Sequence, residues 1–272
     1  MTDYGGRPDP VLVYLDFETT GLDPFGGDRV CEVGLVRVRK GRVEAEFSTL
    51  VNPGRPISPG AAAVNGLNDR VLAGAPHFGE VMPKLLGLIA GATLVAHNAP
   101  FDLNFLAAEL GRLGVPYPGN PALDTLRLAR RHYGFRSNSL QAIARELGLG
   151  LAYPHRALAD AYTTKGVLER LLLGLTGSAE VDPDRVFFLQ GGPVYPEARP
   201  GVCLPPDLAE AVQCRRPLLV RYVDGRGVVT SRLIEPLEVF AQGGAVYLVA
   251  FCHPRGEART FRLDRLVSYQ PA

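Results

Sequence analysis

The chain is poor in the features that mark membrane and secreted proteins. No apolar run in its 272 residues approaches the ~20 residues that a membrane-spanning helix needs. The opening MTDYGGRPDP lacks the basic and then apolar layout of a signal peptide. These absences favour a protein of the cytoplasm and argue against a membrane partner.

Cysteine is scarce as well. The four cysteines, Cys31, Cys203, Cys214 and Cys252, lie far apart and form no C-x-x-C pair. This spacing argues against a zinc site and against a disulfide framework. We therefore expect buried, reduced thiols.

Lysine is nearly absent, since only three of the 29 basic residues are Lys and the other 26 are Arg. Arginine suits planar contacts to phosphate, which would fit a nucleic-acid partner. The same bias would follow from a GC-rich genome, which favours Arg codons. The net charge of +1 does not decide between these interpretations.

The length and composition are those of a globular protein with more than one domain. An apolar fraction of 46% with 21% charged residues is ordinary, and 272 residues exceed the usual size of one domain. The patterns divide the chain into an α/β domain over residues 1–175, a Pro- and Gly-rich linker over 176–204, and a small β-rich domain over 205–272.

The first part has the periodicity of a mixed sheet flanked by helices. An antiparallel start is expected, because two of its strands flank a turn at Lys40-Gly41. The expected strands cover residues 11–18, 29–39, 43–51 and 93–96, and the expected helices cover 78–89, 100–113, 125–131, 140–147 and 157–173. In the last part we expect a helix over 208–214 and strands over 217–222, 227–240, 245–252 and 259–263.

Asp16 and Glu18 lie two residues apart at the end of the first strand. Side chains at this spacing share one face of a strand, so both carboxylates can converge on the same cations. Two acids at the end of an apolar strand are more often a solvated terminus, and D-x-E alone is a weak signal. The stretch from Thr19 to Leu22 that follows favours the functional interpretation.

A second acidic block is A-H-N-A-P-F-D over residues 96–102. It ends a strand and opens a helix, with Pro100 suited to the first helical position and Asn98 or Ala99 near the cap. Asp102 then falls in the first turn, where a carboxylate can complement the helix dipole or face a site. The position alone favours the first of these roles.

The third block is H-R-A-L-A-D over residues 155–160, directly after Pro154. Proline disfavours helix at the residue before it, so we expect His155 in a loop and Asp160 on the helix that follows. On one continuous helix a spacing of five would point the two side chains about 140° apart. They can converge only if His155 precedes the helix.

Together, the blocks D-F-E-T-T-G-L, H-N-A-P-F-D and H-R-A-L-A-D resemble those of the DEDDh exonucleases, which include the proofreading subunits of bacterial replicative polymerases. The resemblance covers roughly residues 9–175. It implies an α/β, RNase H-like fold and 3′-5′ exonuclease activity. The five catalytic positions of the family fall without substitution on Asp16, Glu18, Asp102, His155 and Asp160.

The resemblance also implies a cofactor of two divalent cations, Mg²⁺ or Mn²⁺, which are hard ions that take oxygen ligands. Four carboxylates can hold two such ions for in-line hydrolysis of a phosphodiester. Asp16 is expected to bridge them, with Glu18 and Asp160 at one ion and Asp102 supporting the other. His155 is expected to act as a general base on the attacking water.

The same family binds the terminal nucleotide through the stretch after its first acids, using backbone groups and one apolar wedge. Two residues of the second block are weaker candidates for this contact. The positions implied in this chain are Thr19, Thr20 and Gly21 for the backbone, Leu22 for the wedge, and Asn98 and Phe101.

Three segments near the end of the chain, R-L-I-E-P-L, Y-L-V-A-F-C-H-P-R and R-T-F-R-L-D-R-L, resemble the WYL domain, a small SH3-like β-barrel of bacterial regulators and DNA-processing proteins. Val246 replaces the tryptophan of the naming triplet, which removes any stacking indole. Nine Arg against seven acids over residues 205–272 fit an ordinary solvated face as well as a binding face. The resemblance implies a nucleic-acid or ligand contact through His253, Arg255, Arg259 and Arg262.

Three functions are compatible with these residues. The leading hypothesis is a two-domain enzyme that trims single-stranded or frayed 3′ ends, with DNA favoured over RNA, and releases nucleoside 5′-monophosphates. A ribonuclease would use the same catalytic residues, since selectivity depends on contacts near the 2′-hydroxyl. A regulator that only binds nucleic acid would be marked by incomplete carboxylates, whereas the set here is intact. By analogy, a freestanding repair or defence nuclease fits better than a polymerase-bound proofreader.

Overall fold

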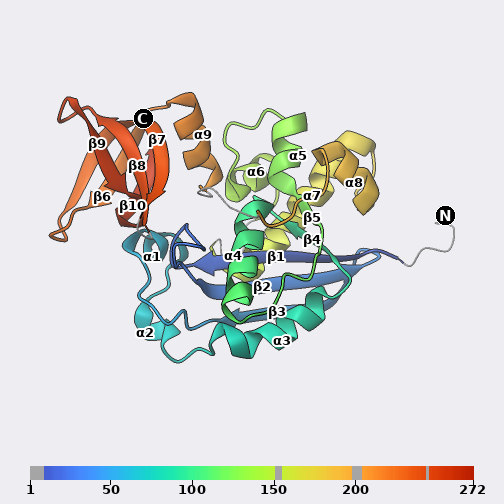
Figure 1. Ribbon diagram of the computed structural model, residues 1–272. Coiled ribbons are helices and arrows are strands. Elements are labelled where there is room, and N and C mark those ends of the chain that lie inside the picture. Colours follow the sequence, from blue (N-terminus) through green and yellow to red (C-terminus); the bar gives the residue numbers. More distant parts are fainter. Residues whose placement is uncertain (1–8, 151–154, 198–203, 243–244) are drawn as a thin grey trace.

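The computed structural model describes residues 9–150, 155–197, 204–242 and 245–272. Within these ranges the chain forms two separate sheets, each of five strands. The first sheet is the centre of an α/β domain, and the second forms a small domain that lies against one end of the first (Figure 1). None of the helices in these ranges combines the length and the apolar character that crossing a membrane requires.

The first domain follows the order of elements that the sequence predicts. Its strands are β1 Val11–Thr19, β2 Val30–Arg39, β3 Arg42–Leu50, β4 Thr93–Ala96 and β5 Ala122–Asp124. Its helices are α1 Pro59–Asn65, α2 Asp69–Leu72, α3 Phe78–Ile89, α4 Ala99–Arg112, α5 Thr125–His132, α6 Leu140–Glu146, α7 Ala157–Thr176 and α8 Pro183–Gln190. The predicted strands and helices are confirmed with ends that move by no more than three residues, whereas α1, α2, β5 and α8 were not predicted as separate elements.

The first sheet is mixed and has the order β3-β2-β1-β4-β5. β1, β2 and β3 are antiparallel, while β4 and β5 run parallel to β1. Val13, Leu15 and Phe17 of β1 point to the face that α3 and α4 cover. Leu12 and Tyr14 point to the opposite face, which α5 to α8 cover. The result is a three-layer α/β arrangement (Figure 1), in agreement with the expected RNase H-like fold.

The linker expected over residues 176–204 is in part folded onto the first domain. α8 begins after Asp182, whose side chain accepts the Asp184 N–H, and ends at Gly191, which adopts a left-handed backbone with φ 87°. Val186 is buried in the core beneath α7. Proline at the helix start and glycine at its end are ordinary helix boundaries, so a Pro- and Gly-rich composition is compatible with this short helix as well as with a linker.

The second domain is an antiparallel sheet in the order β10-β6-β7-β8-β9, which agrees with the expected small β-barrel. The long strand β7 pairs with β6 in its first half and with β8 in its second, and a bulge follows Pro236, which has no N–H to donate. β10 was not predicted. The elements are α9 Pro206–Cys214, β6 Leu218–Val223, β7 Val229–Gln242, β8 Ala245–Cys252, β9 Glu257–Arg262, the 3₁₀ turn η1 Leu263–Arg265 and β10 Leu266–Pro271.

The expectation of buried thiols is correct for two of the cysteines. Cys31 and Cys252 are buried free thiols. Cys214 is exposed instead, because it lies at the open end of α9. Cys203 lies outside the described residues.

Candidate active site

Asp16 and Glu18 project from the end of β1 toward α7. They continue the alternation of Leu12 and Tyr14, so they point to the face that α7 covers. Glu18 is 9% exposed and Asp16 is partly exposed. β1 therefore directs both carboxylates to the side of the sheet on which Asp160 lies.

Asp102 reaches the same place from the opposite layer. β4 ends at Ala96, and its pairing with β1 stops at Tyr14, so Phe17 of β1 has no ladder partner from β4. Asp102, in the first turn of α4, accepts the Phe17 N–H at 3.0 Å and is 3% exposed. Its carboxylate thus binds the strand that carries Asp16 and Glu18, beyond the helix-dipole role that position alone favours.

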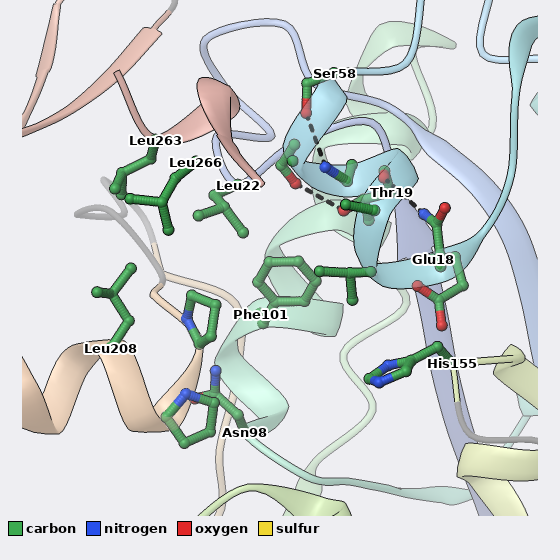
Figure 2. Close-up of a pocket in the computed structure, with 18 of the residues that line it drawn as sticks. Glu18, Thr19, Leu22, Ser58, Asn98, Phe101, His155, Leu208, Leu263 and Leu266 are labelled. Atoms are coloured by element: carbon green, nitrogen blue, oxygen red, sulfur yellow. Dashed lines mark hydrogen bonds between the residues drawn. The ribbon is translucent and has the colours of Figure 1, made fainter. Parts of the chain in front are cut away.

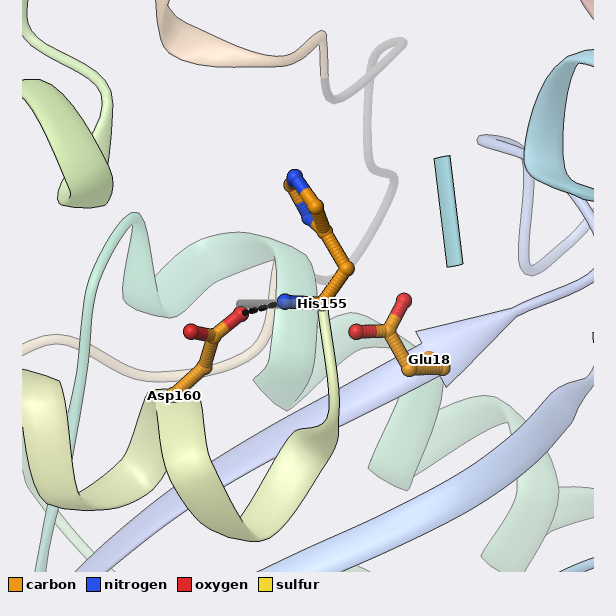
Figure 3. Close-up of side chains that lie close together, drawn as sticks. All are labelled: Glu18, His155 and Asp160. Atoms are coloured by element: carbon orange, nitrogen blue, oxygen red, sulfur yellow. Dashed lines mark hydrogen bonds between the residues drawn. The ribbon is translucent and has the colours of Figure 1, made fainter. Parts of the chain in front are cut away.

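His155 precedes α7, as expected, and Asp160 lies in the first turn of that helix. The His155 N–H donates to Asp160 Oδ2 at 3.1 Å, and His155 has a left-handed backbone with φ 64°. Figure 3 shows both side chains beside Glu18. One ligand atom from each of Glu18, His155 and Asp160 lies within 4.8 Å of the other two. Pro154, on which the loop prediction rested, lies outside the described residues.

Burial and repulsion from neighbouring carboxylates raise the pKa of all four carboxyl groups. Loss of water is the largest cause for each of them. The pKa of Glu18 rises from 4.5 to about 8, and the Asp160 and Glu32 carboxylates add to the effect of burial. The pKa of Asp16 rises well above its ordinary value, with Asp102 as the strongest of its charged neighbours. Four carboxylates this close are unfavourable at neutral pH unless positive charge joins them.

The donor set fits hard divalent cations. Four of the five groups are carboxylates, which Mg²⁺ and Mn²⁺ prefer, and the fifth is an imidazole. The repulsion that raises the carboxyl pKa values is what a bound cation would relieve. The site therefore has the chemistry and the electrostatic strain of a metal site.

A cavity of about 830 Å³ opens at these acids and extends between the two domains. Its size lies within the ~300–1,000 Å³ typical of ligand sites. Figure 2 shows Glu18 and His155 at one end and Leu22 with Phe101 nearer the other. The wall contributed by the second domain includes Leu208, Val246, Leu263 and Leu266.

Close backbone contact and polar bonds hold the second domain against the first. A Cβ added at Gly60, at the start of α1, would lie only 2.8 Å from Leu266 O of β10. In the loop before α6, Ser137 Oγ donates to Asp207 at 2.6 Å. Both domains therefore shape the cavity, although the acids all belong to the first.

Five of the six residues expected to bind substrate line this cavity. The exception, Thr20, is fully buried. Its N–H donates to Arg29 O at 2.9 Å, and its O accepts the Ser58 N–H at 3.2 Å, so its backbone has no free group for a nucleotide. The five that line the cavity are Thr19, Gly21, Leu22, Asn98 and Phe101.

The four basic residues expected to act in the second domain do not line the cavity. His253 and Arg255 lie in the exposed turn between β8 and β9. Arg259, on β9, pairs with Glu257 at 3.2 Å. Arg262 donates to Asp264 at 3.1 Å and 2.5 Å. The structure thus separates these side chains from the acids.

Two residues that the sequence did not mark support the acids. Gln141 of α6 donates to both carboxylate oxygens of Asp160, at 3.3 and 3.2 Å. Asn65, the last residue of α1, donates to Thr19 O at 3.4 Å, and its side chain lowers the pKa of Glu18 in opposition to burial. No motif could identify either residue, because each bond joins segments 19 or 46 positions apart.

Comparison with protein families identifies both parts of the chain. A family model described as "Exonuclease" matches residues 13–168, and one described as "WYL domain" matches residues 205–271. The first match covers more than half of the chain and includes all five residues of the acidic site.

Several curated relatives are bacterial replication proteins. DNA polymerase III subunit epsilon of Pasteurella multocida is 35% identical over 173 residues, which are 61% of this chain and 68% of that protein. DNA polymerase III PolC-type of Thermotoga maritima is 37% identical over 188 residues, which are 67% of this chain. The chain spans only 14% of the length of the Thermotoga protein, so that match concerns a small part of a much longer polypeptide.

Solved structures support the same fold. A structure of exonuclease X in complex with 5′ overhanging duplex DNA has a TM-score of 0.51 at 30% identity and covers 66% of this chain and 99% of that chain. E. coli exonuclease I in complex with a dT13 oligonucleotide has a TM-score of 0.55 at 16% identity and covers 89% of this chain and 55% of that chain. Residues 1–204 are only 75% of this chain, so the second match must extend into the second domain.

Proposed function

The chain belongs to the exonuclease family, and from this membership we propose that it is a metal-dependent exonuclease that removes nucleotides from the 3′ end of a nucleic acid. The observation that carries the proposal is the convergence of four carboxylates and one histidine on a single cavity. These groups are Asp16, Glu18, Asp102, Asp160 and His155.

In this proposal the carboxylates and the histidine of the acidic site have different roles. The four carboxylates of Asp16, Glu18, Asp102 and Asp160 would hold two divalent cations, Mg²⁺ or Mn²⁺. When bound, the cations supply positive charge that stabilises the charge developing on the phosphate oxygens. His155 accepts the proton of the attacking water, and its backbone bond to Asp160 keeps this base beside the carboxylates.

The substrate we propose is single-stranded or frayed DNA, cut to nucleoside 5′-monophosphates. A preference for DNA is supported by the named relatives, which are DNA polymerase III proteins, and by the exonuclease X structure, which contains DNA. Leu22 and Phe101 offer apolar surface to the terminal base. Arg55 and Arg145, which also line the cavity, offer positive charge to phosphates further from the end.

For the chain as a whole we propose two domains, the first extending through α8 and the second beginning near residue 205. The second domain would hold the strand or a ligand through His253, Arg255, Arg259 and Arg262, since the first three are exposed at one end of its sheet. A cytoplasmic location is consistent with the exposed free thiol of Cys214, because such thiols persist in reducing compartments.

The test uses 5′-labelled single-stranded DNA and RNA of equal sequence, incubated with Mg²⁺, Mn²⁺ or EDTA. The wild-type protein is compared with Asp16→Ala and with Asp9→Ala, which removes an exposed carboxylate that pairs with Lys40 at 2.9 Å, away from the cavity. We expect a ladder that shortens from the 3′ end in either metal, absent in EDTA and in Asp16→Ala.

The products also separate the alternatives. Faster loss of the RNA ladder would identify a ribonuclease. Absence of degradation in both metals, with retained binding to the labelled strands, would refute the catalytic proposal in favour of a binding module. Equal activity in Asp16→Ala and the wild-type protein would refute the assigned site.

A further inference from the structure

β2 carries no residue with a proposed catalytic role, yet it holds the start of α7 at two points. Gly34 pairs with Asp16 in the sheet, and a Cβ added there would lie 2.1 Å from the carbonyl carbon of Ala157. The α7 backbone therefore rests directly on β2. Two residues earlier on the same strand, Glu32 pairs with Glu18 and receives the side chain of Arg156.

The contact between Glu32 and Arg156 is bidentate. Arg156 Nε donates to both Glu32 carboxylate oxygens at 3.1 Å, and Arg156 Nη2 donates to Oε1 at 3.0 Å. The Glu32 side chain is 1% exposed and that of Arg156 is 53% exposed. A carboxylate buried to this degree requires a charged partner, and the planar guanidinium fixes the direction of approach as well as the charge.

Arg156 lies inside the turn that carries two of the proposed active-site groups. The carbonyl oxygen of Arg156 accepts the Asp160 N–H at 3.0 Å. The Asp160 carboxylate in turn accepts the N–H of His155, which directly precedes Arg156 in the chain. The left-handed backbone of His155 is uncommon for a residue other than glycine and persists only where surrounding contacts impose it. The side chain of Arg156 connects this turn to the strand next to Glu18.

We propose that Glu32 and Arg156 form a clamp that positions His155 and Asp160 against Glu18. The two residues are positioning residues, since neither of them lines the cavity that contains the reacting groups. The inference rests on the proposed exonuclease function. It adds that β2 sets the distance between the base His155, which precedes α7, and the carboxylate of Glu18 on β1.

The first experiment measures kcat and KM on single-stranded DNA for the wild-type protein, Arg156→Ala and Arg156→Lys. We expect Arg156→Ala to lower kcat by about 10- to 100-fold, because small displacements of catalytic groups have effects of this size. KM should change by less than about threefold, since the substrate contacts are untouched. Arg156→Lys keeps the charge without the bidentate geometry, so its kcat should fall between the two.

The matched control is Arg39→Ala, which removes an arginine of β2 whose partner, Glu44, lies 2.6 Å away and outside the cavity. Its kcat should equal that of the wild-type protein. Asp16→Asn is measured in parallel. If the wild-type protein is no more active than Asp16→Asn, the proposed function fails; if the wild-type protein is active and Arg156→Ala matches it, only the clamp fails.

A double variant separates positioning from stability. Arg156→Ala alone leaves the buried Glu32 charge without a partner and should lower Tm, whereas Glu32→Gln with Arg156→Ala removes the charge and should restore much of that loss. We expect kcat of the double variant to stay low although its Tm recovers. Recovery of kcat together with Tm would overturn the inference, because the pair would then serve stability alone.

Discussion

Without a divalent cation, the stability of the protein should fall as pH rises from about 5 to about 7.5. The cause is Glu18, whose pKa in the folded protein is about 8 against an ordinary 4.5. The folded state thus binds this proton more tightly than the unfolded state does, and the advantage is lost as pH rises between these two values. Glu18 alone accounts for a loss of about 3 kcal/mol over that interval.

Such a loss corresponds to roughly 6–12 °C in Tm for a chain of this size. The assay is thermal unfolding in EDTA at several pH values, repeated with millimolar Mg²⁺ or Mn²⁺. The pKa values of Asp16 and Asp102 are shifted in the same direction, so the measured slope should be at least that of Glu18. A bound cation replaces the protons, and the slope should then flatten.

Glu18→Gln provides the control, because it removes the charge and keeps the shape of the side chain. In EDTA near pH 7.5, this variant should be more stable than the wild-type protein and should lose most of the pH dependence that Glu18 contributes. The reasoning is refuted if the wild-type Tm in EDTA is flat or rises over this interval. It is equally refuted if Glu18→Gln has no higher Tm than the wild-type protein.

Three further predictions follow from the site. His155→Ala should lose turnover while it still binds the oligonucleotide, because the variant has no general base for the attacking water; unchanged turnover in the variant would exclude the assignment. Gly34→Ala should displace α7, since its Cβ would lie 2.1 Å from Ala157, and should lower both activity and Tm. The control Gly74→Ala has no atom within 4 Å of its new Cβ and should change neither activity nor Tm. Equal activity and Tm in the two variants would contradict the close approach of α7 to Gly34. Gln141→Ala should raise the Mn²⁺ concentration that gives half-maximal activity by about 10- to 100-fold, because the residue orients a ligating carboxylate, and an unchanged titration would exclude that role.

The sequence predicted the fold wherever an element has its own pattern. β1, α3 and β4 alternate or repeat in ways that identify them locally, and their bounds agree with the structure. β5 has three residues, and its strand character comes from parallel pairing with β4 and a bridge between Ala122 and Val194. β10 likewise depends on its pairing with β6. The three residues of β5 are too few for a periodic pattern, so tertiary contacts define that strand.

The residues of the candidate site were likewise predictable only where a contiguous motif contains them. The five acidic-site residues were predictable because three contiguous blocks carry them, each with a recognisable chain context. Supporting residues such as Glu32 and Gln141 lie in segments with no motif, and their importance depends on sheet register and helix placement. Leu263 and Leu266 are an extreme case. Both side chains belong to the core of the second domain, and their place in the wall of the cavity depends on the close contact of Gly60 with β10. A substitution at Gly60 should therefore alter the cavity without changing any residue that the motifs identify.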